Sequence, residues 1–194
     1  MTEALEDVRD AIDEWCRDRS WLPRAPLLLW MIALAVRHFL DTDYTSILGG
    51  LNLGIHEAGH LLFGWLSWDF LTAAGGTLLQ LGAPAASIYM FSRQPDYFAA
   101  AFCGTWLATN LYNVATYMAD ARELDLPLVN VGGGEAEHDW SFMLSAVGVL
   151  EWDTRLAALV RLLAFVVAWT SVAAAAWMLW RMAAPPRAGR RSDT

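Results

Sequence analysis

Five long apolar runs place the strongest limit on how this chain can fold. They cover residues 22–40, 47–66, 70–92, 98–118 and 156–182. As helices, runs of this length can cross a hydrocarbon layer about 30 Å thick. A shorter stretch over residues 140–151 would rise only about 18 Å, so it predicts a half-span or part of a sixth crossing. The pattern predicts an all-α integral membrane protein with a bundle of five to six transmembrane helices.

The segments outside these runs divide the chain further. Residues 1–20 carry seven acidic side chains, and their apolar residues lie at the spacing of a narrow helical stripe: Leu5, Val8, Ile12 and Trp15. Anionic lipid headgroups would repel this acidic amphipathic helix, so we expect its stripe to pack on its own chain or on a partner. Residues 21–184 form the predicted transmembrane domain, and the Arg- and Pro-containing tail 185–194 is predicted to be disordered.

The composition agrees with a location in the lipid bilayer and argues against nucleic acid as a partner. Hydrophobic residues make up 56% of the chain, and several of the 11 tryptophans lie at the edges of apolar runs, where indole rings settle at a membrane interface. The net charge is −8, and the 13 basic residues, all arginine, form no patch that could bind nucleic acid.

Arginines gather at the two ends of the predicted bundle. Four lie before the first run or at its start, and four lie at the end of the last run or after it: Arg9, Arg17, Arg19, Arg24, Arg181, Arg187, Arg190 and Arg191. The positive-inside rule therefore predicts that both termini are cytoplasmic, which requires an even number of crossings. The arginine-only set of basic residues is typical of a GC-rich bacterial genome. For an integral protein with cytoplasmic termini, we therefore expect the cytoplasmic (inner) membrane of a bacterium as the location.

Three ionisable residues interrupt the second apolar run, in the stretch "LNLGIHEAGHLLFGWL". His56 and His60 lie one turn apart on one face of a helix, so both imidazoles can reach a single ion. Glu57 lies beside that face, where it can take a proton from metal-bound water. Imidazole ligands and an open position for water are typical of catalytic zinc. The alternative, two interior histidines that only pack helices, would leave the buried Glu57 without a partner.

A third metal ligand is expected from "GGGEAEHDW", residues 132–140. His138 is the first choice, with Asp139 or Asp120 as alternatives. The three glycines at 132–134 would let this loop fold back into a water-lined cavity. The simpler reading is a surface loop in which Asp139 caps the following helix.

The fourth run carries a polar stripe at helical spacing: Trp106, Asn110, Asn113, Tyr117 and Asp120. We expect this stripe to face a hydrated cavity across from the two histidines. Asn110 and Asn113 could then hold a substrate backbone or an oxyanion. Hydrogen bonds that only join neighbouring helices are an equally good account of either asparagine.

The motif "HEAGH" at 56–60, placed in an early apolar run, resembles the intramembrane zinc metalloproteases of the site-2 protease group. The resemblance implies that His56 and His60 bind zinc, that Glu57 activates water, and that an aspartate from a later span completes the site. That group supplies its aspartate from a Leu-Asp-Gly stretch, whereas the nearest match here is "LDLP" at 124–127.

Three functions agree with these features. The first is a membrane-embedded zinc hydrolase, a peptidase that cleaves a membrane-anchored or membrane-proximal peptide. The second is a non-catalytic or metal-stabilised structural subunit of a larger membrane complex, which the small size and the striped N-terminal helix would suit. The third is a metal-dependent enzyme that acts on a lipid or another small amphiphile.

Overall fold

The computed structural model describes residues 2–127 and 138–184, and these residues form an all-helical fold. The predicted disorder of the tail 185–194 and the predicted fold-back of the glycines at 132–134 lie outside the described residues. Seven α-helices and one 3-10 turn, η1, follow one another: α1 (Thr2–Cys16), α2 (Ala25–Leu40), α3 (Gly49–Gly64), α4 (Asp69–Arg93), α5 (Tyr97–Ala119), α6 (Asp139–Ala146), η1 (Leu150–Trp152) and α7 (Asp153–Ala183).

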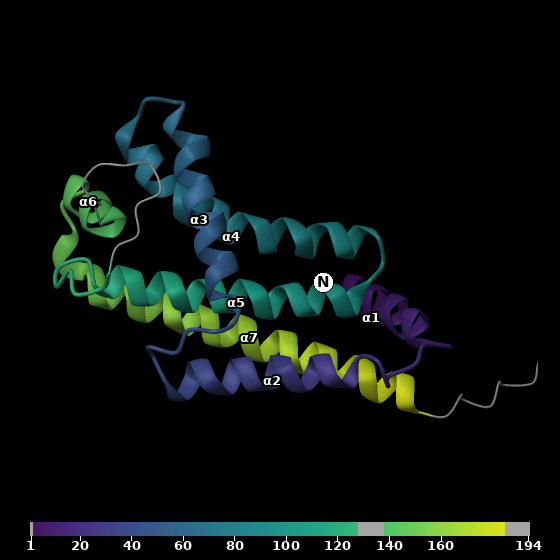
Figure 1. The fold of residues 1–194 in the computed structure, drawn as a ribbon. Coiled ribbons are helices and arrows are strands. Elements are labelled where there is room, and N and C mark those ends of the chain that lie inside the picture. Colours follow the sequence, from purple (N-terminus) through teal and green to yellow (C-terminus); the bar gives the residue numbers. More distant parts are fainter. Residues whose placement is uncertain (1, 128–137, 185–194) are drawn as a thin grey trace, which may run out of the picture.

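Helices α5 and α7 form the centre of the molecule and lie side by side along most of their length (Figure 1). Small residues make this close approach feasible, since Ala164 of α7 is fully buried and a Cβ on Gly104 of α5 would collide with the Ser171 side chain. Helix α2 packs against both, with Met31 completely buried between them. This three-helix layer is the base on which the remaining helices rest.

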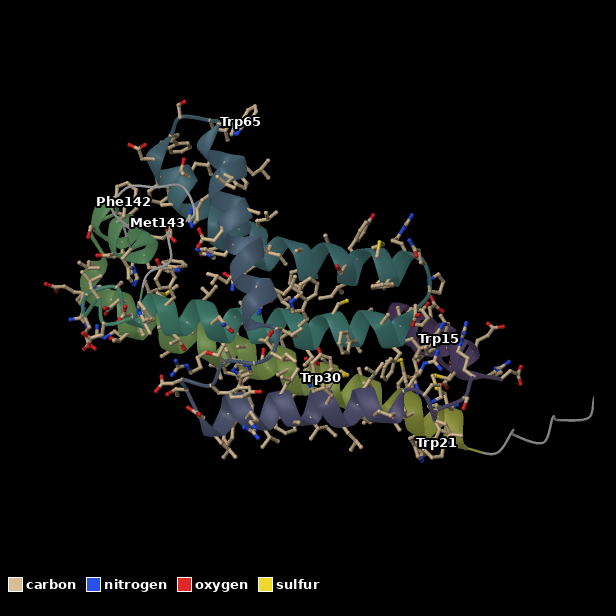
Figure 2. The ribbon with its side chains drawn as sticks, in the orientation of Figure 1. Trp15, Trp21, Trp30, Trp65, Phe142 and Met143 are labelled. Atoms are coloured by element: carbon tan, nitrogen blue, oxygen red, sulfur yellow. The ribbon has the colours of Figure 1, made fainter. Side chains whose placement is uncertain are left out.

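Helix α3 and the first part of α4 form a hairpin that extends away from this layer, and the rest of α4 runs along α5 (Figure 1). Its two helices touch through glycines, because a Cβ on Gly59 would overlap the backbone carbonyl of Gly75. Trp65, in the turn that joins the helices, lies at the far end of the hairpin and is almost fully exposed (Figure 2). The glycine contact brings the α3 face that carries His56 and His60 directly against α4.

The N-terminal helix α1 packs on the last turns of α7, at the opposite end of the molecule from α6 (Figure 1). Trp15 and Cys16 are buried there, and Asp13 forms a 2.9 Å ion pair with Arg181 of α7. Ile12 also contacts this core, but Val8 is 55% exposed. Of the stripe residues whose side chains the structure describes, Ile12 and Trp15 are therefore covered by their own chain, whereas Val8 is not.

The prediction of five to six transmembrane helices is wrong. In the described part of the chain, a single helical stretch, Leu150–Ala183, is long and apolar enough to cross a membrane. Helices α2 and α3 have 16 residues each and rise about 24 Å, short of a hydrocarbon layer of about 30 Å. The predicted sixth segment, 140–151, is divided between the eight-residue α6 and η1.

Helices α4 and α5 have the length of a span but not the composition. They contain 25 and 23 residues, yet polar side chains such as Gln80, Asn110 and Asn113, together with glycines, lower their average hydropathy. In the most apolar stretch of α7, only 28% of the residues are buried inside the protein, so the apolar surface of this helix is largely uncovered. Within the described residues, the fold therefore supports one helix that could cross a membrane.

Candidate metal centre

Three side chains from two helices converge at the inner face of the α3–α4 hairpin. Helix periodicity places His56 and His60 one turn apart, and their Nε2 atoms lie 3.0 Å from each other. Asp139, the first residue of α6, places its Oδ2 atom 3.1 Å from Nε2 of His56 and 3.3 Å from Nε2 of His60. These three residues form a group that could hold a metal ion. Tetrahedral zinc with bonds near 2.0–2.1 Å separates its ligand atoms by about 3.3 Å, so the triangle has the right size.

The outer nitrogens of both imidazoles are held by oxygen acceptors. Nδ1 of His56 lies 3.0 Å from Oε1 of Gln80, and Nδ1 of His60 lies 2.8 Å from the backbone carbonyl oxygen of Thr72. Because a carbonyl oxygen can only accept, each Nδ1 carries the proton and donates it. Each Nε2 then turns an unshared electron pair towards the centre. This is the arrangement by which proteins orient histidines that ligate a metal.

The three central atoms are consequently all acceptors, with no proton of their own to share. A cation between them, either a proton or a metal ion, is needed to offset their mutual repulsion. The hydrogen bond to Asp139 raises the pKa of His60, although burial acts in the opposite direction. Burial alone would raise the pKa of Asp139, but its hydrogen bonds to His56 and His60 outweigh burial and lower that pKa. The raised pKa of His60 and the lowered pKa of Asp139 both indicate a site that attracts positive charge.

Tyr117 of α5 holds the Asp139 carboxylate in place. Its hydroxyl lies 3.4 Å from Oδ2 of Asp139 and accepts a 3.2 Å hydrogen bond from the backbone N–H of the same residue. Burial raises the pKa of Tyr117, so its hydroxyl keeps its proton at neutral pH and can donate to the carboxylate. Tyr117 belongs to the polar stripe of the fourth apolar run, but no local pattern marks it for this supporting role.

A glycine in α4 makes room for the cluster. A Cβ built on Gly76 would lie 2.6 Å from the Nε2 atoms of both His56 and His60. Such a contact is too close for any residue with a side chain. The pair Gly75 and Gly76 therefore serves two purposes, since the first allows α3 and α4 to touch and the second leaves space for the imidazoles.

The cluster opens onto a cavity of about 860 Å³ between α3, α4, α5 and α6. Glu57 is half-buried and lines this cavity next to the two histidines. Asn113 also lines the cavity, and its Oδ1 atom is buried with no hydrogen-bond partner among the described residues. Both side chains are thus available to a molecule that enters the cavity.

The other site residues predicted from the sequence lie outside the cluster. His138 precedes α6 and caps it, because its Nδ1 atom accepts a 3.2 Å hydrogen bond from the Ser141 backbone N–H. Its Nε2 atom lies 3.3 Å from Asp120, which itself accepts from two backbone N–H groups in the turn after α5. The structure therefore brings Asp139, one of the two alternatives, into the group that could hold a metal ion, whereas His138, the first choice, lies outside it at the helix terminus.

Asn110 is also directed elsewhere. It is fully buried, and its amide donates a 3.0 Å hydrogen bond to the backbone carbonyl of Trp106, one turn earlier in α5. The Trp106 indole in turn donates to Asn52 of α3 at 2.8 Å, which ties α3 to α5. Of the two asparagines expected to meet a substrate, only Asn113 is among the residues that line the cavity.

Comparison of the chain with protein families, curated proteins and solved structures finds no match.

Proposed function

We propose that the protein is a zinc-dependent hydrolase in which His56, His60 and Asp139 hold the metal. The convergence of three acceptor atoms with fixed orientation is the observation that carries this proposal. Two nitrogens and one carboxylate oxygen form a ligand set that zinc commonly accepts in enzymes. Zinc held by three protein ligands keeps a fourth position for water and makes that water a nucleophile near neutral pH.

Glu57 is the proposed general base. Its half-buried carboxylate follows His56 directly on α3 and lines the same cavity as the cluster, so it can accept a proton from the attacking water. The proton would then pass to the leaving group as the bond breaks. Tyr117 and the two oxygen atoms that accept hydrogen bonds from the histidine Nδ1 atoms keep the ligands in position. Asn113 lines the cavity and can orient a bound substrate.

A peptide is the proposed substrate. The cavity of about 860 Å³ lies within the usual range for sites that enclose a small ligand or a few residues of a chain. The arrangement of "HEAGH" on α3 supports the resemblance to zinc metallopeptidases, and the exposed apolar face of α7 supports a substrate anchored in or near the same bilayer.

We further propose that α7 anchors the protein in the cytoplasmic (inner) membrane of a bacterium. A single crossing by α7 would place the two ends of this helix on opposite sides of the bilayer. This differs from the expectation of two cytoplasmic termini, which required an even number of crossings.

Two variants of the full chain in neutral detergent test the proposal. Glu57→Gln should keep the zinc content of the wild type, because all three ligands remain, and should lower the hydrolysis of quenched fluorescent casein by roughly a hundredfold or more. His60→Ala should lose the metal, because two protein ligands hold zinc poorly. Zinc content is measured by elemental analysis of the purified protein. Full zinc occupancy in His60→Ala would contradict the metal site itself.

A metal-stabilised structural subunit is the second candidate, because Asp139 belongs to α6 whereas both histidines belong to α3. A metal ion here would cross-link two helices that are far apart in sequence. In this case, chelation would lower the melting temperature, and Glu57→Gln would leave both zinc content and melting temperature unchanged. A wild type that binds zinc but hydrolyses no substrate would favour this candidate.

A further inference from the structure

A second cavity of about 480 Å³ lies where α2, α5 and α7 meet. It contains no residue of the metal cluster, although His38, Thr42 and Tyr112 also line the larger cavity and form a shared wall. Most of its remaining lining is apolar, with Phe39 of α2 and Phe165 of α7 among the larger side chains.

One charged side chain, Arg161 of α7, lies in the wall of this cavity. In residues 2–127 and 138–184, no carboxylate forms an ion pair with it, whereas Arg122 pairs with Asp153. One guanidinium nitrogen, Nη2, donates a 3.2 Å hydrogen bond to Oγ1 of Thr116, and Nε is buried with no partner in the described residues. Arg161 as a whole is half-buried, and an anion bound in the cavity would supply the counter-charge that its guanidinium lacks in the described residues.

His38 of α2 supplies a second polar group without a partner. It is 4% exposed, its ring stacks on Tyr112 with the ring centres 4.8 Å apart, and its Nε2 atom is buried without a hydrogen bond to a described residue. Burial lowers the pKa of His38 to about 4, so the imidazole is neutral at pH 7 and can donate one hydrogen bond. The cavity therefore presents a cation and a neutral donor to its contents.

The rim of the cavity is apolar and continues outwards. Phe39 and Leu162 border the cavity and are 61% and 60% exposed, and Phe39 is followed in the chain by the exposed Leu40. A ligand that fits must combine an anionic group, for Arg161 and His38, with an apolar chain that can lie along α2 and α7.

The position of Arg161 in α7 agrees with this chemistry. No charged residue occurs between Arg161 and Arg181, and the uncharged stretch 162–180 rises about 28 Å as a helix. That is close to the thickness of a hydrocarbon layer, so a bilayer crossed by α7 would place Arg161 at the level of the lipid headgroups.

We propose that this cavity is a binding site for an anionic amphiphile, with Arg161 and His38 holding its phosphate or carboxylate group and the apolar rim holding its acyl chain. The site is independent of the proposed zinc chemistry, because neither residue is a ligand in the metal cluster. An anionic phospholipid has both parts of the required chemistry.

Titration calorimetry of the full chain in neutral detergent tests this site. The probes are dioleoyl phosphatidylglycerol, dioleoyl phosphatidylcholine and inorganic phosphate. The wild type should bind phosphatidylglycerol at least tenfold more tightly than either other probe. Arg161→Gln should weaken phosphatidylglycerol binding by roughly tenfold or more, as expected when charge-assisted hydrogen bonds are lost. Arg155→Gln is the matched control, since it removes the same charge from an exposed position on the same helix.

Ala158→Phe provides a test that keeps the guanidinium. Ala158 is exposed and borders the cavity, so a phenyl ring there should fill the cavity without disturbing the core, and it should also weaken phosphatidylglycerol binding. Equal losses in Arg155→Gln and Arg161→Gln would overturn the proposal, since they would indicate general charge attraction. If inorganic phosphate bound as tightly as phosphatidylglycerol, the cavity would be a site for a free anion. Equal binding of phosphatidylglycerol and phosphatidylcholine would show that the anionic group plays no part in binding.

Discussion

Substitution of Gly76 by alanine should weaken zinc binding without changing any ligand. The new Cβ would lie 2.6 Å from Nε2 of both His56 and His60, whereas ordinary contacts begin at 3.4 Å. The imidazoles or α4 must therefore move by about 0.8 Å, several times the tolerance of about 0.2 Å for metal–ligand distances. Because loss of outer support for a metal site typically costs 10–100-fold in affinity, we expect Gly76→Ala to weaken zinc binding by roughly that factor.

The assay is competition with a chromophoric zinc chelator at fixed pH. Gly82→Ala is the matched control, because Gly82 lies in the same helix and a Cβ there would meet nothing within 4 Å. Both substitutions gain about 1 kcal/mol of helix propensity, so any difference between them reports the contact with the imidazoles. A folded Gly76→Ala variant with wild-type zinc affinity would show that the two histidines do not converge beside α4, and the reasoning would fail.

Three further outcomes are expected. Asp139→Asn should weaken zinc binding at least tenfold in the same competition assay, whereas His138→Ala should change it less than twofold because that imidazole caps α6. Burial lowers the pKa of His38 to about 4 in the folded protein, whereas the unfolded chain takes up this proton near pH 6.5. The free energy of unfolding should therefore fall as the pH decreases from 6.5 to about 4. The loss should approach about 3 kcal/mol in chemical denaturation, and His38→Asn should not show it. Arg122→Gln would leave the buried carboxylate of Asp153, 2.7 Å from the guanidinium, without its counter-charge and should lower the midpoint of chemical denaturation.

Local periodicity was enough to predict much of the helical structure and two of the three residues of the metal cluster. His56 and His60 are four residues apart, so the helix itself brings their imidazoles together. The N-terminal helix was also predictable, because the spacing of Ile12 and Trp15 fits one face of a helix that contacts the core.

Features that depend on tertiary packing were not predictable in the same way. Asp139 lies 83 residues from His56, and nothing local distinguishes it from its neighbour His138 as a ligand. The Thr72 carbonyl that orients His60 is a backbone atom, so no residue type marks it. The predicted number of spans was wrong for two other reasons. Helix α3 ends at Gly64 after 16 residues and is too short to cross, whereas α4 and α5 are long enough but too polar.

The docking of α1 has a consequence for biosynthesis. Trp15 is made early, but the residues of α7 that share its core, Met178 and Leu179, follow about 160 positions later. At typical translation rates of about 5–20 residues per second, α1 waits roughly 8–30 s for this part of α7. During that interval its tryptophan face is available to chaperones or to other nascent chains. Chains truncated before residue 178 would therefore lack the α7 part of the surface on which α1 docks.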